Sequence, residues 1–349
     1  MSKTPSSSKN RRRRITAALT GLTAMISLSA CSGAADSGLT TVSVGHASGL
    51  TNVPLYIAIE RGYFEDEGLE VDLQAFKSGG DMVAPLSSGD LDAGTGAPGA
   101  GIFNAVGRDL GVRLVGDTGH LDDDNKYSSL IVRKELVDSG QFSELEDLKG
   151  LRMGLYADGT STTLWFDRAL DEAGLDRSDV TANYLSGPDQ AISLESGAID
   201  AATLAEPYAS KVIESGDAVR FAVGADFYPE LQLGTMMYGT EFSQNSPDEA
   251  VAFMKGWLRG VEDFNENIVG GQLKGEDADE IVGILSEYTE MDEDLLRGVY
   301  FPAISADGGM NTEGLADDLQ TFREDGLVEE PDLVIDDIID TSFVEQAGA

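Results

Sequence analysis

Cysteine and histidine are almost absent from this chain of 349 residues. Cys31 is the only cysteine, so no internal disulfide can form and no Cys–His nucleophile pair can be built downstream of it. His46 and His120 are the only histidines, and both are expected in loops after strands, where they could meet. Two histidines without close spacing make a weak metal site, so ordinary loop histidines are favoured, and we expect no metal and no cofactor.

Basic residues are also scarce. The chain has 24 lysines and arginines against 62 acidic residues, a net charge of −38. Residues 1–30 hold six of the basic residues and no acid, so the remainder has a net charge near −44. No basic patch is left to neutralise phosphates, which argues against a nucleic-acid partner and against docking on anionic lipid except through an anchor. The scattered acids indicate a heavily solvated surface, and we hypothesise a salt-tolerant source, because counterions relieve self-repulsion.

The first thirty residues have the pattern of an export signal. The apolar stretch 15–30 follows a basic start and is too short for a transmembrane helix, so it fits a signal peptide. Its end, Leu28-Ser29-Ala30-Cys31, resembles the lipobox of bacterial lipoproteins, which implies that Cys31 is lipidated and begins the mature chain. The alternative is an ordinary signal peptide with a chance cysteine, and the run 11–14 of four arginines could also be read by a twin-arginine export route. Residues 31–40 are expected to form a polar tether.

The body of the chain alternates short apolar strands with helices, which predicts an α/β fold. The last third is expected to be mostly helical and to complete the first lobe. Expected strands cover 42–45, 69–73, 91–93, 112–115, 130–132 and 199–203. Expected helices cover 54–61, 164–173, 248–270, 276–288, 311–324 and 333–343.

The chain also repeats itself. Residues 78–97 match residues 186–205 at ten of twenty positions, including a Ser-Gly-x-Asp segment in each copy. Each copy predicts a strand, then a short helix capped by Asp81 or Asp189, then a buried strand. Ligands of open α/β sheets bind outside the carboxyl ends of the strands, so two such lobes facing each other predict a cleft between them. The alternative is that the two segments share a local structure without having arisen by duplication.

The lobe boundaries are placed in polar stretches. Residues 121–127 are acidic and are expected to be the first crossover, and residues 223–233 the return. This division predicts one lobe from residues 41–125 and 230–349, and a second lobe from residues 126–229.

Three segments together resemble a family of solute-binding proteins for nitrate, sulfonates, taurine and thiamine-pyrimidine precursors. They are Val53–Ala58 with the following Glu60–Phe64 and Glu67–Val71, then Leu148–Gly154, and then Glu206–Tyr208. The resemblance covers about residues 41–345 and is specific for the family but not for the ligand. It implies a type II periplasmic-binding-protein fold, two lobes joined by two hinge strands, and closure around a ligand.

Candidate ligand-binding residues of the first lobe follow its strands. Helix capping is the structural alternative for the polar pair, and a tight turn is the alternative for the loop that also holds Lys77. The glycine run 94–101 predicts a close approach of the backbone to a small ligand. The run lacks the Gly-Lys-Ser or Gly-Lys-Thr of a phosphate-binding loop. Within it Thr95 is the favoured contact. The candidates are Thr51, Asn52, Ser78, Gly79, Thr95 and Gly96.

The second lobe offers a hydroxyl-rich helix start. Thr160, Ser161 and Thr162 precede the helix 164–173, and the number of hydroxyls exceeds what capping needs, so an anion site is favoured there. Glu206 follows a buried strand and suits an aminated ligand, with a structural salt bridge as the alternative. Tyr238 follows the return strand and is a further candidate, with core packing as its alternative.

The signal and the lipobox predict a lipid-anchored, extracytoplasmic protein. The resemblance implies that it acts as a monomer, captures a small polar ligand of the sulfonate, taurine or aminopyrimidine kind between its lobes, and delivers it to an ABC permease. A lipid-anchored sensor is one alternative. An enzyme of the thiamine-pyrimidine synthase type on the same fold is the other, and it is disfavoured because the cysteine-rich motif of that group is missing.

Overall fold

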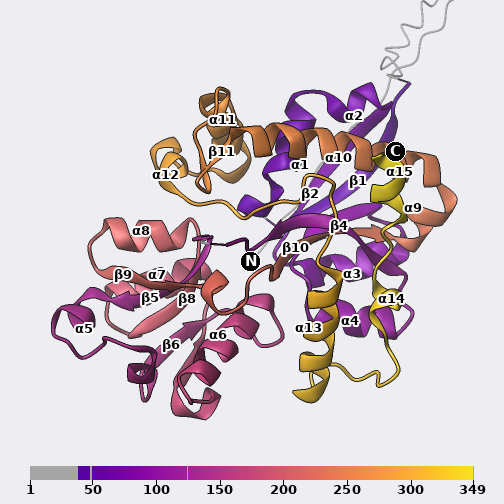
Figure 1. Ribbon diagram of the computed structural model, residues 1–349. Coiled ribbons are helices and arrows are strands. Elements are labelled where there is room, and N and C mark those ends of the chain that lie inside the picture. The colour runs from indigo at the N-terminus through magenta and orange to yellow at the C-terminus, as the bar shows by residue number, and fades with distance from the viewer. Residues whose placement is uncertain (1–37, 48, 124, 349) are drawn as a thin grey trace, which may run out of the picture. The chain divides into compact units, whose positions relative to one another are not determined.

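The computed structural model describes residues 38–47, 49–123 and 125–348. Cys31, the signal peptide and most of the tether lie outside these residues. Within them, no helix is both long and apolar enough to cross a membrane. Two five-stranded sheets form the frame, as the α/β prediction expected (Figure 1).

The first sheet has the strand order β2-β1-β3-β10-β4. Strands β1, β2 and β3 are parallel, and β10 is antiparallel to both β3 and β4. The bounds are β1 Thr40–Ala47, β2 Leu69–Phe76, β3 Ala93–Gly96, β4 Val112–His120 and β10 Gln232–Gly239.

The second sheet has the corresponding order β7-β6-β8-β5-β9. Here β6, β7 and β8 are parallel, and β5 is antiparallel to β8 and β9. Each sheet therefore contains one reversed strand next to its third parallel strand, which agrees with a chain built from two similar units. The bounds are β5 Ser128–Arg133, β6 Arg152–Leu155, β7 Thr181–Tyr184, β8 Ala201–Ala205 and β9 Ala218–Val223.

The chain passes between the sheets twice. It leaves the first sheet at His120 and enters the second at Ser128, then leaves at Val223 and re-enters the first at Gln232. Both passages contain the boundaries placed from the sequence, and the exact division into lobes stays a prediction.

The repeated segments fold alike, with two differences from the prediction. Helices α3 (Gly79–Ser88) and α7 (Gly187–Glu195) begin after Ser78 and Ser186, so serine, not aspartate, stands at each cap position. The two aspartates instead accept hydrogen bonds from these serine hydroxyls. The prediction was wrong because Ser and Asp stand three residues apart, a spacing at which either side chain can face the first turn.

The strands after these helices begin two residues later than predicted in both copies. The apolar residues Leu91 and Ile199 precede β3 and β8 rather than lying in them. A Cβ on Gly45 of β1 would lie 2.8 Å from Leu91 Cδ1, and one on Gly154 of β6 would lie 2.7 Å from Ile199 Cδ1. Each residue thus packs onto a strand glycine, which makes it buried without making it part of a strand.

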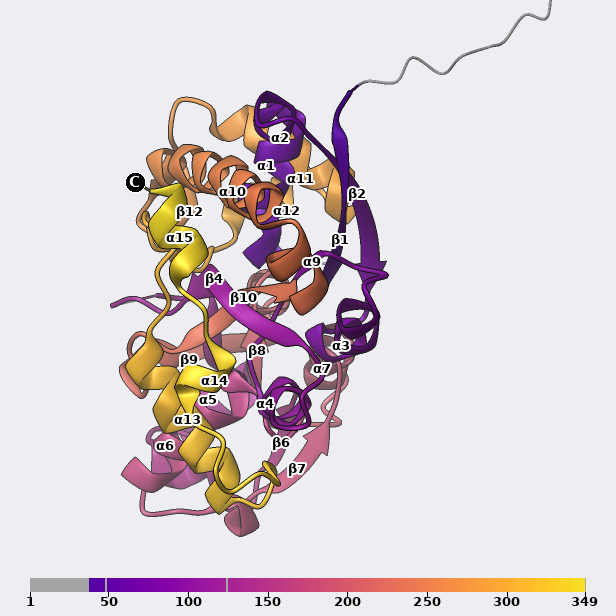
Figure 2. The same ribbon diagram turned by 90° about the vertical axis from the view of Figure 1, so that its right-hand side faces the viewer.

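Helices α1 (Val53–Glu60), α2 (Tyr63–Asp66) and α10 (Pro247–Asn267) cover one face of the first sheet (Figure 2). Glycines let α10 cross the others closely, since a Cβ on Gly260 would lie 2.2 Å from the carbonyl oxygen of Pro54. Most other helices flank the second sheet or extend the first: α4 Ala100–Gly107, α5 Lys134–Asp138, α6 Ser161–Glu172, α8 Tyr208–Glu214, α9 Thr240–Asn245, α11 Ala278–Thr289 and α12 Glu293–Gly298.

The C-terminal segment returns to the first sheet. Helix α13 (Thr312–Glu324) packs beside α4 through Phe322 and Phe103, whose ring centroids lie 6.0 Å apart. The predicted helix 333–343 is wrong as one piece. It is divided into α14 (Ile335–Ile338) and α15 (Ser342–Ala347), because Asp340 N–H bonds to the carbonyl of Leu114 in β4.

Candidate functional site

The two halves of the chain touch at the start of two helices. Gly99 and Thr160 form an isolated antiparallel bridge, and Ala100 N–H donates to the carbonyl of Gly159 at 3.2 Å. A Cβ on Gly99 would lie only 2.5 Å from that carbonyl oxygen, so the contact requires glycine. The N-termini of α4 and α6 therefore face a common region between the sheets, where backbone N–H groups favour an anion.

Capping of α6 uses only part of the hydroxyl cluster. Thr163 Oγ1 donates to the carbonyl of Thr160 at 2.6 Å and accepts from the Thr160 N–H at 3.3 Å. Thr160 Oγ1 donates to the carbonyl of Ala157 and lies 3.1 Å from Thr162 Oγ1. Ser161 is buried, and among the described residues its hydroxyl has no hydrogen-bond partner. Ser161 therefore keeps a hydroxyl available at this helix start.

The favoured contact of the first lobe, Thr95, turns inward. It is buried, and its hydroxyl donates to Asn52 Oδ1 at 2.5 Å, while Asn52 Nδ2 donates to the carbonyl of Ala47. Asn52 stands at the N-cap position of α1, but its side chain makes no capping hydrogen bond there. The pair instead connects the end of β1 and the end of β3 to the turn before α1 through hydrogen bonds. These polar atoms are therefore used within the protein and stabilise the edge of the first sheet. Thr51 stands half-buried beside it, against Gly119 and Gly234.

The glycines of the next loop pack on each other. A Cβ on Gly96 would lie 2.6 Å from Gly79 Cα, so the close backbone approach expected for a ligand is made between two protein segments. Ser78 Oγ donates to Asp81. Direct contact of Ser78, Gly79 and Gly96 with a ligand stays a prediction.

Glu206 is buried and already paired. Its carboxylate accepts from Arg220 Nη2 at 2.7 Å and from the N–H and hydroxyl of Ser210 at 3.0 and 2.9 Å. Burial raises the pKa of Glu206, and the bonds from Ser210 and Arg220 oppose that rise. The geometry matches the structural salt bridge that the sequence left open.

Tyr238 lies in the core of the first sheet. Its ring is enclosed by Phe242, Phe253 and Phe343, and its hydroxyl donates to the carbonyl of Ala250 at 2.9 Å. This geometry matches the core packing that the sequence analysis named as the alternative.

The two histidines lie in strands, not in loops, and they have different partners. His46 in β1 bonds to the Tyr56 hydroxyl at 3.0 Å, and His120 ends β4 beside Asp117. The expectation that they meet is therefore wrong, because strands β3 and β10 lie between β1 and β4 in the sheet. Among residues 38–348 as described, no group of three or more His, Cys, Asp or Glu side chains could hold a metal ion.

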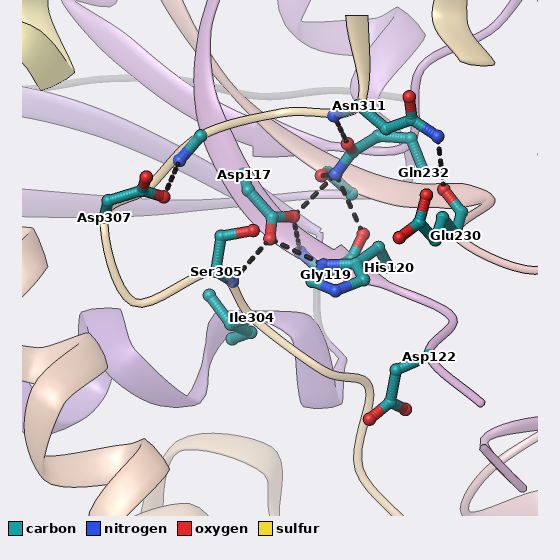
Figure 3. A network of polar contacts seen from close by, with 12 residues as sticks. Asp117, Gly119, His120, Asp122, Glu230, Gln232, Ile304, Ser305, Asp307 and Asn311 are labelled. Atoms are coloured by element: carbon teal, nitrogen blue, oxygen red, sulfur yellow. Dashed lines mark hydrogen bonds and ion pairs between the residues drawn. The ribbon is translucent and has the colours of Figure 1, made fainter. Parts of the chain in front are cut away.

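A buried polar network joins the two passages between the sheets (Figure 3). The fully buried carboxylate of Asp117 accepts from His120 Nδ1, Gly119 N–H, Gln232 Nε2 and Ser305 N–H at 2.6–2.8 Å. Burial lowers the pKa of His120, but the hydrogen bond and charge of Asp117, with Asp122 and Glu230, outweigh it and raise that pKa. The network ties together β4, β10 and the segment after α12, next to both passages of the chain between the sheets.

Sequence reasoning missed three tyrosines at the edge of the second sheet. Tyr127 precedes β5, Tyr156 follows β6, and Tyr208 begins α8 after β8. Because β5 runs antiparallel to β8, its start lies at the same edge as the ends of β6 and β8. The signal that could have found them is their position next to strand ends, where ligands of α/β sheets bind.

The hollows of the surface do not mark the predicted site. One of about 1210 Å³ is lined by α10, α15 and the loop 306–310, and it contains none of the predicted ligand-binding residues. Another of about 430 Å³ is lined by Gly159 and Thr163 beside the α6 start, and by Phe322 and Leu327.

Comparison with known proteins supports the same fold. A putative aliphatic sulfonates-binding protein of Bacillus subtilis is 28% identical over 319 residues, which are 84% of each chain. The periplasmic nitrate-binding protein NrtA of Synechocystis PCC 6803 superposes with a TM-score of 0.70 at 12% identity, over 89% of this chain and 88% of its own. The desulfurization enzyme DSZB superposes with a TM-score of 0.60 at 16% identity, over 88% and 98%.

The structural likenesses concern the fold, which is that of two-lobed periplasmic binding proteins, as predicted. The sequence match is more specific, since the model of the NMT1-like family covers residues 35–267. This chain is therefore a member of the NMT1-like family, among whose relatives are solute-binding proteins of ABC import systems.

Proposed function

We propose that this chain captures a small organic anion, a sulfonate foremost, outside the cytoplasm and delivers it to an ABC permease. The observation that carries the proposal is the meeting of Gly99 with Thr160, which brings the hydroxyl-bearing start of α6 next to the start of α4. Free N–H groups at helix starts favour an anion there. The sulfonate-binding name of the Bacillus subtilis relative points to the same ligand class.

We assign residue roles from the polar groups that remain free of hydrogen bonds to the protein backbone. Ser161, Thr162 and Thr51 provide ligand contacts, since none of their hydroxyls is bonded to a backbone group. Thr95, Asn52 and Thr160 hold the walls in place. The pairing of Glu206 with Arg220 favours an anion over an aminopyrimidine, because the carboxylate is already neutralised.

Cys31 is proposed to carry a lipid that keeps the mature protein at the membrane. A Cys31→Ser variant expressed in a Gram-positive host should lose incorporation of labelled palmitate and appear in the medium. Retention of the label by the variant would rule out Cys31 as the anchor.

The ligand is tested by thermal unfolding of residues 32–349 with taurine, alkanesulfonates, nitrate, bicarbonate, aminopyrimidines and riboflavin. A ligand at one hundred times its Kd should add about 2.7 kcal/mol of stability. Ser161→Ala should weaken sulfonate binding roughly tenfold, while Ser139→Ala, on the exposed end of α5, serves as the control. A sulfonate affinity that is equal in both variants would remove Ser161 from the site.

The second candidate function is that of an enzyme, because the desulfurization enzyme DSZB has a similar fold. The sequence has no cysteine after Cys31, and both histidines are hydrogen-bonded within the protein. Unchanged sulfonate after prolonged incubation with the protein, measured by ion chromatography, is the result expected for a binding protein. Release of sulfite would overturn that assignment.

A further inference from the structure

The tyrosine hydroxyls of this chain divide into two groups. All ten tyrosines are described, and the hydroxyls of six have a protein atom to which they can donate: Tyr56, Tyr63, Tyr184, Tyr228, Tyr238 and Tyr288. The other four donate to no atom of the described residues, and these are Tyr127, Tyr156, Tyr208 and Tyr300. The hydroxyls of Tyr127, Tyr208 and Tyr300 are not among the buried atoms of the described residues that lack a partner, so they are accessible and can donate to water or to a ligand.

Three of the four lie together at one edge. A Cβ on Gly187 would lie 2.6 Å from Tyr208 Cδ2 and 3.0 Å from the Tyr156 hydroxyl, so both side chains pack at the start of α7. The carbonyl of Tyr127 accepts from the Glu206 N–H at 2.9 Å, which places Tyr127 at the end of β8. The Tyr156 hydroxyl accepts from the Ala205 N–H at 3.5 Å and keeps its proton free to donate.

Two cations lie near Tyr300 on this side of the second sheet, and Asp122 and Asp123 line the same hollow as Lys126 and Tyr300. Arg220 pairs with Glu206 and lies 5.2 Å from the centroid of the Tyr300 ring, and the Lys126 ammonium lies 5.0 Å from the same centroid. Lys126 has no carboxylate partner among the described residues. Both cations lie near the ring of Tyr300, and Lys126 directly precedes Tyr127.

The tyrosines remain neutral donors. Burial raises the pKa of Tyr127, Tyr156 and Tyr208 above the ordinary tyrosine value, so their O–H groups stay protonated at neutral pH. All three are half-buried, so each keeps a face open to a ligand. Neutral O–H groups donate well to anionic oxygens, and the rings can cover an apolar chain.

We propose that Tyr127, Tyr156 and Tyr208 donate their hydroxyls to the anionic group of the ligand and pack their rings on its short organic part. This inference rests on the proposed function and names the second-lobe side of that same site. Tyr156 stands four residues before Thr160 in one connection, so the tyrosines and the α6 start belong to one wall.

The test is calorimetric titration of the mature chain with ethanesulfonate, taurine, sulfate, nitrate and acetate. Tyr127→Phe, Tyr156→Phe and Tyr208→Phe keep the rings and remove only the hydroxyls. Each should weaken oxyanion binding roughly tenfold, the value of one hydrogen bond to a charged group, and the triple variant should weaken it further. Tyr184→Phe is the matched control, because its exposed hydroxyl bonds to Asp158, and it should bind as the parent does.

The outcomes separate this inference from the proposed function. Parent-like affinity in all three variants overturns the tyrosine assignment and leaves sulfonate capture standing. Binding of nitrate, sulfate or acetate but no sulfonate, weakened in the variants, supports the tyrosines and overturns the sulfonate proposal. A parent protein that binds no oxyanion of the panel overturns both. Equal melting temperatures of parent and variants without ligand verify that folding is unaffected.

Discussion

The Oδ2 atom of Asp117 lies 2.8 Å from Nδ1 of His120, and the two side chains join the outgoing and returning passages of the chain through Gln232. Because a carboxylate only accepts, Nδ1 must carry the proton. The pKa of His120 is raised in the folded state. Its contribution to stability is therefore complete below the unfolded pKa of about 6.5 and is lost as pH rises through the folded value.

We expect His120→Gln to remove this loss. The melting temperature of the parent should fall more steeply than that of the variant as pH rises from 6 to 8.5. His46 provides a control of opposite sign, because burial lowers its pKa and its contribution is lost as pH falls. Parallel pH profiles for the parent and His120→Gln would show that the Asp117–His120 pair does not respond to pH.

Gly99→Ala is expected to separate the two halves of the chain without unfolding either. The Cβ would lie 2.5 Å from the carbonyl oxygen of Gly159, while the backbone of Gly99 is extended and suits any residue. Ligand affinity should fall about tenfold or more, and small-angle scattering should show a larger radius of gyration. Gly101→Ala is the control, since its Cβ would meet no atom within 4 Å. Identical scattering of Gly99→Ala and the parent would contradict the prediction.

Arg220→Met should cost about 3 kcal/mol of unfolding free energy, because it leaves the fully buried carboxylate of Glu206 without its cation. Arg297→Met makes a matched comparison, since its partners Asp279, Glu293 and Asp294 are exposed, and its effect on the unfolding free energy should be much smaller. Urea unfolding measures both. Equal losses in the two variants would mean that Glu206 tolerates burial without Arg220.

The repeat predicted the fold better than it predicted the site. Ser-Gly-x-Asp and the glycines around it recur in sequence, and the two sheets that they build have the same strand order. The Thr95 hydroxyl donates a hydrogen bond to Asn52, 43 residues earlier in the chain, and no local sequence pattern predicts a bond over that separation. Glu206 and Arg220 likewise become partners only when β8 and β9 flank β5.

The tyrosines of the second sheet could not be found from spacing at all. Tyr127, Tyr156 and Tyr208 lie in three separate connections, and each looks like an ordinary half-buried aromatic in the sequence. Only the strand order, in which β5 runs antiparallel to β8, brings the strand ends next to these three tyrosines to one edge of the sheet. The hydroxyl cluster at 160–162 was recognisable because its members are adjacent.

The melting temperature should rise from low salt to 1 M NaCl. The mature chain has a net charge near −44, and the Debye length falls from about 10 Å at 0.1 M salt to about 3 Å at 1 M. Screening therefore relieves repulsion among surface carboxylates more than it weakens the few ion pairs. A melting temperature that stays flat or falls over this range, measured calorimetrically, would remove the case for a salt-tolerant source.

Asp318 should make the protein less stable as pH rises from about 4 to about 6. Its carboxyl lies buried in α13, and the Tyr228 hydroxyl donates to it at 2.6 Å. Burial raises the pKa of this carboxyl to about 6. The folded state then holds a proton that the unfolded state releases near pH 3.9, so the contribution of Asp318 to stability is complete below that value and is lost as pH rises.

The loss of unfolding free energy should be on the order of 2–3 kcal/mol, and Asp318→Asn should abolish it in urea unfolding at pH 4 and pH 6.5. The exposed neighbour Asp317 serves as the control, since Asp317→Asn should retain most of the loss. An unchanged pH dependence in Asp318→Asn would mean that this carboxyl is ionised in the folded protein, with Arg168, stacked on the Tyr228 ring at 3.3 Å, compensating its charge.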